Sequence, residues 1–228
     1  MSVVDRLNET RARVADAAAR AGRSPADVLL IAVSKTFTIE AVRAAYDAGQ
    51  RDFGENRVQD ALQKIDASAD MDIRWHLIGH LQSNKARRAA ERIALIHSID
   101  SVDLLRRIEA AAAEASRRPQ LLVQVDLAAE ATKHGAAPEI VPAIFDEGRH
   151  CTAAELVGLM LLPPLAENPD DARPWFRRLR ELRDRLLDGG VPSSMLRQLS
   201  MGMSHDFEVA IEEGATMVRV GTAIFGHR

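Results

Sequence analysis

The sequence has little of several features that mark specialised classes of protein. It holds one cysteine, Cys151, among 228 residues, so no internal disulfide can form. No apolar run approaches the roughly 18 residues needed to span a bilayer. No N-terminal stretch combines a basic start, an apolar core and a cleavage site of small residues. These absences predict a soluble protein in a reducing, cytoplasmic compartment.

Net positive charge is also missing. The formal net charge is −3 and the pI is near 6.2, which excludes an overall basic field of the kind that draws proteins to nucleic acid or anionic lipid. Lys85, Arg87, Arg88 and Arg92 form one local cluster, but no aromatic residues for base stacking accompany it, so a solvated helix face is favoured. The composition favours a small-molecule partner over nucleic acid or a membrane.

Linkers and low-complexity segments are absent as well. No stretch rich in Pro, Gly or Ser divides the chain, and 46% apolar residues suffice for a sizeable core. We therefore expect residues 1–228 to form one domain.

What is present is an alternation of short apolar runs and helical patterns. The apolar runs lack apolar/polar alternation, which is typical of strands buried on both faces of a parallel sheet. Eight β-then-α repeats favour a closed (β/α)₈ TIM barrel over an open doubly wound sheet. The strands are expected at residues 28–35, 51–56, 74–80, 94–100, 120–127, 155–162, 197–204 and 215–226.

An additional amphipathic helix is expected at the N-terminus, over residues 3–21, with Gly22 as its C-terminal cap. The last strand is expected to run almost to the end of the sequence with no helix after it. We expect the N-terminal helix to occupy that position in the outer ring.

Lys35 stands at the end of the first expected strand, where the sequence reads VLLIAVSKTF (28–37). The active face of such a barrel is built from the C-terminal ends of the strands and the loops that follow. At an apolar mouth, desolvation disfavours the charged ammonium and frees the neutral amine to attack a carbonyl or aldehyde. The alternative is a surface charge that happens to follow a strand, and Lys35 alone does not decide between the two.

A second feature lies near the other end of the chain. In SMGMSHDFE (200–208), Ser204 is expected to cap a helix that begins on the active face. In VRVGTAIFG (218–226), Gly221 lets a backbone N–H approach an anion, and Thr222 adds a hydroxyl donor. Barrels often hold a phosphate between the loops after strands seven and eight. Barrel closure makes this site a neighbour of Lys35, and pyridoxal phosphate, an aldehyde that bears a phosphate, satisfies both.

The sequence resembles the pyridoxal phosphate homeostasis proteins, small single-domain relatives of the N-terminal barrel of alanine racemase, which is a fold-type III barrel. The resemblance extends from the first strand to the last residue. It is carried by LIAVSKTF (30–37), FGENRVQD (53–60), WHLIGHLQSNK (75–85), IHSIDS (96–101), GLM (158–160), LSMGMSHDFEVAI (199–211) and RVGTAIFGHR (219–228).

The resemblance implies pyridoxal phosphate as the cofactor and Lys35 as the residue that forms a Schiff base with its aldehyde. It implies that Ser204, Gly221 and Thr222 bind the phosphate, with Ser200 contributing nearby. His205 stands at a variable position of the family's motif.

The same resemblance implies that two further residues contact the cofactor ring. Arg219 would lie beside the pyridine nitrogen, and Asn56, in GEN, would line the ring pocket. A guanidinium in that place keeps the ring nitrogen unprotonated, so that the ring is a weak electron sink.

Two functions remain open from the sequence. The resemblance implies a non-catalytic protein that holds pyridoxal phosphate, takes part in its homeostasis and supplies it to apo-enzymes; the alternative is a cofactor-dependent amino-acid racemase. Racemisation by two bases needs an acid/base group on each face of the substrate Cα, and in alanine racemase the second is a tyrosine from a C-terminal domain that is not expected here. Tyr46 is expected on a helix away from the site, although His76 or His80 could replace such a tyrosine. The carrier is favoured, and a monomer is expected because the racemase dimer contacts depend on that domain.

Two motifs are weighed against a site role. His76 and His80 have the spacing of a zinc pair on a helix, but four residues of a strand span about 13 Å, too far for one ion, so no metal site is expected. Lys133, in ATKHG, could act as a second amine near the mouth that helps transfer the cofactor, or be an ordinary loop lysine.

Overall fold

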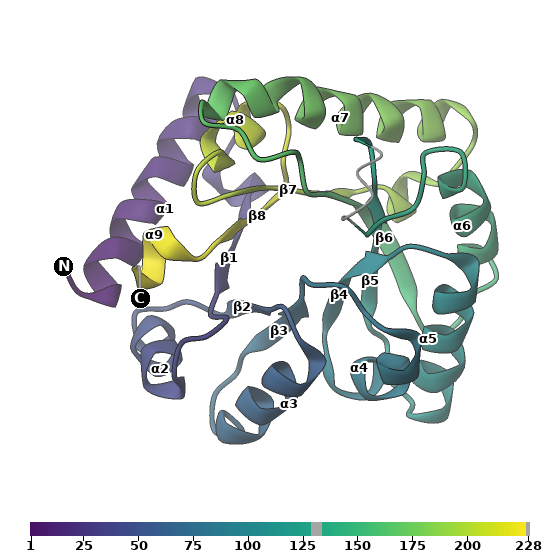
Figure 1. The fold of residues 1–228 in the computed structure, drawn as a ribbon, viewed down its shortest axis with the longest axis horizontal. Helices are drawn as coiled ribbons and strands as arrows, with labels where there is room; N and C mark the ends of the chain where they lie inside the picture. The colour runs from purple at the N-terminus through teal and green to yellow at the C-terminus, as the bar shows by residue number, and fades with distance from the viewer. Residues whose placement is uncertain (129–133, 227–228) are drawn as a thin grey trace.

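A computed structural model describes residues 1–128 and 134–226, and its strands close into a parallel barrel (Figure 1). Each strand pairs with the next along the chain, and β8 pairs with β1, as the repeat pattern predicted. The strands are β1 (Leu29–Val33), β2 (Asp52–Glu55), β3 (Arg74–Leu77), β4 (Leu95–Ile99), β5 (Gln120–Val125), β6 (Glu155–Leu161), β7 (Gln198–Met203) and β8 (Met217–Val220).

Helices surround the barrel and follow the strands in turn (Figure 1). In the described residues they are α1 (Val3–Arg20), α2 (Ile39–Asp47), α3 (Val58–Ala67), α4 (Ala86–Arg92), α5 (Val102–Glu114), α6 (Val141–Gly148), α7 (Arg173–Asp188), α8 (Phe207–Glu212) and α9 (Thr222–Phe225), with short 3₁₀ helices η1 (Pro25–Asp27), η2 (Ser83–Lys85), η3 (Pro169–Ala172) and η4 (Ser193–Met195). No helix in these described ranges is long and apolar enough to cross a membrane.

Two apolar layers hold the barrel together. The larger lies between the sheet and the helices and includes Leu7, Phe53 and Phe176, all fully buried. The smaller fills the barrel interior and includes Ile31 and Met217. Burial on both faces explains why the strands read as continuous apolar runs rather than alternating ones.

The N-terminal helix α1 completes the outer ring, as expected. It packs against α8, α9 and α2, on the side of the barrel where β8 meets β1 (Figure 1). The guanidinium of Arg6 on α1 donates to the carbonyl oxygens of Ile224 and Phe225, at 2.8 and 3.1 Å. The first and last elements of the described chain are therefore bonded to each other.

The end of the barrel differs from the prediction. Residues 215–226 were expected to be one strand with no helix after it, but β8 stops at Val220 and α9 follows. The Gly221 backbone leaves the extended region, and the N–H groups of Ile224 and Phe225 then bond to the Gly221 carbonyl. Apolar residues continue across this break because Ile224 and Phe225 of α9 are buried, so the sequence pattern could not show where the strand ends.

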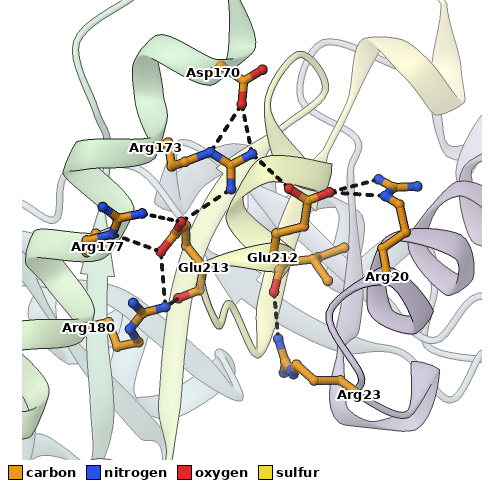
Figure 2. Close-up of polar contacts among 9 residues, drawn as sticks. Arg20, Arg23, Asp170, Arg173, Arg177, Arg180, Glu212 and Glu213 are labelled. Atoms are coloured by element: carbon orange, nitrogen blue, oxygen red, sulfur yellow. Dashed lines mark hydrogen bonds and ion pairs between the residues drawn. The ribbon is translucent and has the colours of Figure 1, made fainter.

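Charged side chains join α7 and α8 to α1 (Figure 2). Glu213 is nearly buried and bonds to Arg173, Arg177 and Arg180 at 3.0 to 3.2 Å. Arg173 also bonds to Glu212, which reaches across to Arg20 on α1 (Figure 2). This network, which we call the α7–α8 arginine network, fixes the helices that flank the β7–β8 end of the barrel.

Candidate functional site

A cavity of about 540 Å³ opens at the C-terminal ends of the strands. This is the face that carries the active site in barrels of this kind. Six of the seven residues predicted as cofactor-binding line it: Lys35, Asn56, Ser204, Arg219, Gly221 and Thr222. They come from loops and strands at opposite ends of the sequence, and the β8–β1 pairing brings them together.

Lys35 lies two residues beyond the end of β1, and its side chain is exposed. The desolvated amine expected from the apolar run is therefore not what the structure shows. The reason is that β1 ends at Val33, and a turn, with the Phe37 N–H bonded to the Ser34 carbonyl at 3.0 Å, places Lys35 beyond the buried layer. Thr36 has φ +69°, a conformation that costs a β-branched residue about 1–3 kcal/mol and persists only where the surroundings impose it.

The turn around Lys35 is held from the outer side of the sheet by a group that sequence reasoning missed. Glu55 is fully buried, and its carboxylate accepts hydrogen bonds from the Ser34 hydroxyl and from Lys64 on α3. The Lys64 ammonium also donates to the Ser34 carbonyl at 2.7 Å. The only signal was Glu55 itself, a charged residue at the end of an apolar strand.

Aromatic packing brings the two halves of the site together. The Phe37 ring, two residues after Lys35, stacks on the Phe225 ring of α9 with 5.1 Å between centroids. The turn that carries Lys35 is thus in contact with the helix that follows Gly221.

Ser204 has a different partner from the one predicted. It was expected to cap the next helix, but α8 begins at Phe207. Instead the Ser204 hydroxyl accepts hydrogen bonds from the backbone N–H groups of Gly221 and Ala223, at 3.0 and 3.4 Å. Ser204 and Gly221 both line the cavity, so this contact joins the two loops predicted to hold a phosphate.

Close backbone approach explains two glycines of the site. A Cβ on Gly221 would lie 3.3 Å from the Val33 carbonyl oxygen of the neighbouring strand, closer than most real contacts. A Cβ on Gly79 would lie 2.2 Å from the Asn56 carbonyl oxygen, so no side chain fits there. Gly79 therefore lets the loops after β2 and β3 pack tightly enough to place Asn56 at the cavity.

Arg219 reaches the cavity from inside the barrel and is only 3% exposed. One of its terminal nitrogens donates to the Ser200 hydroxyl at 2.6 Å and the other to the Leu161 carbonyl at 2.8 Å. Burial lowers the pKa of Arg219 to about 10, while nearby Asp206 opposes the shift. The side chain therefore remains a cation at neutral pH.

Asp206 and His205 also line the cavity, and neither was predicted to be a site residue. Burial raises the pKa of Asp206, although the hydrogen bond from the Met203 N–H and the charge of Arg219 act in the other direction. His205 is bonded through Nε2 to the Glu167 carbonyl at 3.0 Å. Apolar residues 162–166, after β6, complete the wall.

Ser200 is the predicted residue that the structure does not place at the cavity. It is fully buried on β7 inside the barrel, and its hydroxyl is taken up by Arg219 and by His97 on β4. As Ser200 lies four residues before the strand-end Ser204, it points into an earlier layer of the barrel. Its contacts connect it to Arg219 rather than to the predicted phosphate position.

The residues considered as second bases lie elsewhere. The Tyr46 hydroxyl accepts the Asp72 N–H on the outer side of the barrel. His76 is buried between Asp52 and His97, and His80 stacks on His134 with 3.7 Å between ring centroids, so these two histidines have separate surroundings. Lys133 lies outside the described residues.

Comparison with known proteins shows the family of the chain. The family described as "Alanine racemase, N-terminal domain" matches residues 6–228. The pyridoxal phosphate homeostasis proteins of Aquifex aeolicus and Pseudomonas aeruginosa are 43% and 44% identical to the chain, cover all of it, and are themselves covered over 99% and 96% of their lengths.

Solved structures agree in fold. PipY of Synechococcus elongatus, solved without and with PLP bound, gives TM-scores of 0.89 and 0.87 at 40% and 39% identity, with 99% of this chain and 100% of that chain covered. An alanine racemase of Clostridium difficile gives a TM-score of 0.75 at 15% identity, over 98% of this chain and 57% of that one, which shows the shared fold. The chain therefore belongs to the alanine racemase N-terminal domain family and, within it, to the pyridoxal phosphate homeostasis proteins.

Proposed function

We propose that this protein binds pyridoxal 5'-phosphate in the cavity at the mouth of the barrel, with Lys35 as the covalent attachment point, and that its role is to hold and supply the cofactor to apo-enzymes. One observation carries the proposal: an amine, a buried cation and two hydroxyl side chains, those of Lys35, Arg219, Ser204 and Thr222, line the same cavity. The structure of PipY with PLP bound and the names of the homeostasis proteins support it.

The cofactor supplies an aldehyde that condenses reversibly with amines, and a phosphate that needs hydrogen-bond donors. Lys35 offers an exposed amine on a turn fixed by the bonds at Ser34. The Ser204 hydroxyl, which keeps its own proton to donate while its oxygen accepts the Gly221 N–H, and the Thr222 hydroxyl offer donors for a phosphate. The residues present therefore fit the group.

Arg219 affects which chemistry the ring of a bound cofactor would favour. As a buried cation with its N–H groups directed by two fixed acceptors, it offers the ring nitrogen a donor that does not give up its proton at neutral pH. It thereby disfavours a protonated ring nitrogen and the carbanion chemistry that such a ring promotes. This supports holding the cofactor over turning over amino acids.

The arrangement of bases supports the carrier over the racemase. Tyr46, His76 and His80 are engaged away from the cavity. Among the described residues, His205 is the one histidine that lines it. A racemase is the second candidate through His205, the histidine that lines the cavity together with Lys35.

Chemical trapping tests the attachment point. The purified protein charged with pyridoxal phosphate should show an imine absorption band, and borohydride reduction followed by peptide mapping should place the label on Lys35. Lys35→Ala should abolish the band, whereas Lys85→Ala, which changes an amine on η2 away from the cavity lining, should leave it unchanged. A label on another lysine would refute the assignment.

Deuterium exchange separates the two functions. The charged protein is incubated with single-enantiomer amino acids in heavy water, and uptake at Cα is followed by mass spectrometry. We expect no turnover comparable to that of a racemase. Rapid exchange that His205→Ala removes would favour the racemase instead.

A further inference from the structure

A continuous line of hydrogen bonds crosses the barrel interior from its floor to the cavity. It begins at Asp52, the first residue of β2, whose Oδ1 is 3.0 Å from His76 Nε2. His76 Nδ1 is 3.0 Å from His97 Nε2, and His97 Nδ1 is 2.9 Å from the Ser200 hydroxyl. Ser200 in turn accepts from Arg219 at 2.6 Å. Asp52, His76, His97, Ser200 and Arg219, which we call the buried relay, come from five different strands or strand ends.

Donor and acceptor capacity at the two ends of the relay sets the direction of its bonds when each imidazole carries one proton. Arg219 has only donors, so Ser200 accepts from it, and the Asp52 carboxylate has only acceptors, so His76 donates to it. With one proton on each ring, His97 Nδ1 is then an acceptor and receives the Ser200 hydroxyl proton. His97 then carries its proton on Nε2 and donates to His76 Nδ1, and His76 donates from Nε2 to the Asp52 carboxylate. In this arrangement all the bonds point from Arg219 to Asp52, and each imidazole carries its proton on Nε2.

The surroundings favour this single arrangement. His97, Ser200 and His76 are at most 2% exposed, so water does not compete for their bonds. Burial, together with the charge of Arg219, lowers the pKa of His97 well below its ordinary value, which keeps the ring neutral. At the floor, the second Asp52 oxygen accepts from Arg74 at 2.8 Å, so the carboxylate stays ionised and oriented.

We propose that the buried relay positions Arg219 for the cavity, and that Ser200, His97, His76 and Asp52 act on the bound ligand only through that guanidinium. Arg219 has two anchors, the Leu161 carbonyl and the Ser200 hydroxyl, and the relay determines the second. This deepens the proposed function, because it rests on a ligand in the cavity. It also gives Ser200 a role different from the phosphate contact predicted from the sequence.

Two serine substitutions form a matched test. Ser200→Ala removes one oxygen from the relay. Ser98→Ala removes one oxygen from the adjacent position of β4, where the buried hydroxyl has no hydrogen-bond partner among the described residues. In the cofactor-free protein, long-range ¹H–¹⁵N spectra should show His97 and His76 protonated on Nε2. Ser200→Ala should mix the His97 tautomers and shift the Arg219 side-chain signals, while Ser98→Ala should change neither.

Ligand binding provides the second readout. Positioning through Arg219 predicts that Ser200→Ala weakens binding of pyridoxal phosphate and of pyridoxal by the same factor, roughly five- to fifty-fold. Asp52→Asn is a nearly isosteric change at the other end of the buried relay, and it should weaken binding of the two ligands by equal factors that are smaller than those for Ser200→Ala. This variant replaces Ser200→Ala in the test if the serine variant does not fold. Ser98→Ala should bind both as the unaltered protein does.

The outcomes are distinct. Weakened binding of pyridoxal phosphate alone would make Ser200 a phosphate contact and overturn the proposal, as would a His97 tautomer that does not depend on Ser200. If the unaltered protein takes up neither ligand, the proposed function fails, and the tautomer spectra of the cofactor-free protein still decide whether the relay positions Arg219.

Discussion

At the scale of single residues, the structure places a buried ion pair beside the turn that carries Lys35. Glu55 and Lys64 lie between the sheet and α3, and both bond to Ser34, the residue before Lys35. A buried ion pair is weak evidence for stability, but removal of one partner leaves the other charge uncompensated. The pair therefore ties the geometry of the Lys35 turn to the integrity of the barrel wall.

Lys64→Met should lower the free energy of unfolding by about 3–5 kcal/mol, because it strands the Glu55 carboxylate in a buried site. Urea unfolding followed by circular dichroism measures the loss. The double variant with Glu55→Gln should recover part of it, since the stranded charge is gone. Equal stability of Lys64→Met and the unaltered protein would show that the pair is not maintained in solution.

At the scale of elements, the α7–α8 arginine network fixes the end of the barrel that carries Ser204 and Gly221. Glu213 sits among Arg173, Arg177 and Arg180 (Figure 2). Those arginines are between 31% and 53% exposed, so water screens part of the attraction. The network contributes chiefly by satisfying the nearly buried carboxylate and by joining two helices.

Glu213→Gln should destabilise the protein by about 1–3 kcal/mol, because charge-assisted hydrogen bonds are lost at a nearly buried position. Thermal or urea unfolding gives the value. Asp184→Asn is the matched control: the Asp184 carboxylate, paired with Arg183, is half exposed, and pairs of exposed carboxylates contribute at most about 1 kcal/mol. Similar losses in the two variants would show that Glu213 behaves as a surface charge.

At the scale of the whole molecule, paired carboxylates make the free energy of unfolding depend on pH. The pKa of Glu212 is lowered, chiefly by its bond to Arg173. For Asp52 and Glu213, burial raises the pKa but is outweighed by their bonds to His76 and Arg74, and to Arg177 and Arg173, so both values are lowered. Each folded value lies below the unfolded one, so the stabilisation is present above the unfolded value and is lost as pH falls through the folded value.

Unfolding free energy should therefore decline as the pH falls below about 4.5, the ordinary value for Glu. Asp206, whose pKa burial raises, acts in the opposite sense, because protonation relieves its burial penalty. Urea titrations at about pH 7, 5, 4 and 3 measure the slope, and Glu213→Gln should flatten it. A stability that rises over this acid range would contradict the assignment of the paired carboxylates.

Much of the architecture was readable from patterns along the chain. Continuous apolar runs predicted each strand and the closed barrel, and Gly22 marked the end of the N-terminal helix region. Boundaries were less accurate: Ser34 and Lys35 fall beyond β1, and α9 replaces the end of the last expected strand. A continuous run of apolar residues indicates that a segment is buried. It does not distinguish a buried strand from a buried turn or helix that follows the strand.

The candidate site was predictable in part, from polar residues and glycine at the ends of the expected strands. Lys35, Ser204 and Gly221 could be recognised in the sequence because each interrupts an apolar pattern at the end of a strand. In the structure all three line one cavity. Asp206 was not recognised as a cavity residue, and Ser200 was assigned to the wrong layer. A residue's depth in a barrel depends on strand stagger, which no local pattern records.

By itself, the sequence determined that the chain closes into a parallel barrel, because the spacing of its apolar runs leaves both faces of each strand to be buried. It also determined the family to which the chain belongs. Only the tertiary structure decided that Lys35 is exposed on a strained turn and that Asp52, His76 and His97 connect to Arg219. Those hydrogen bonds join strands that are far apart in the sequence. They can form only when barrel closure has fixed how the strands are aligned with one another.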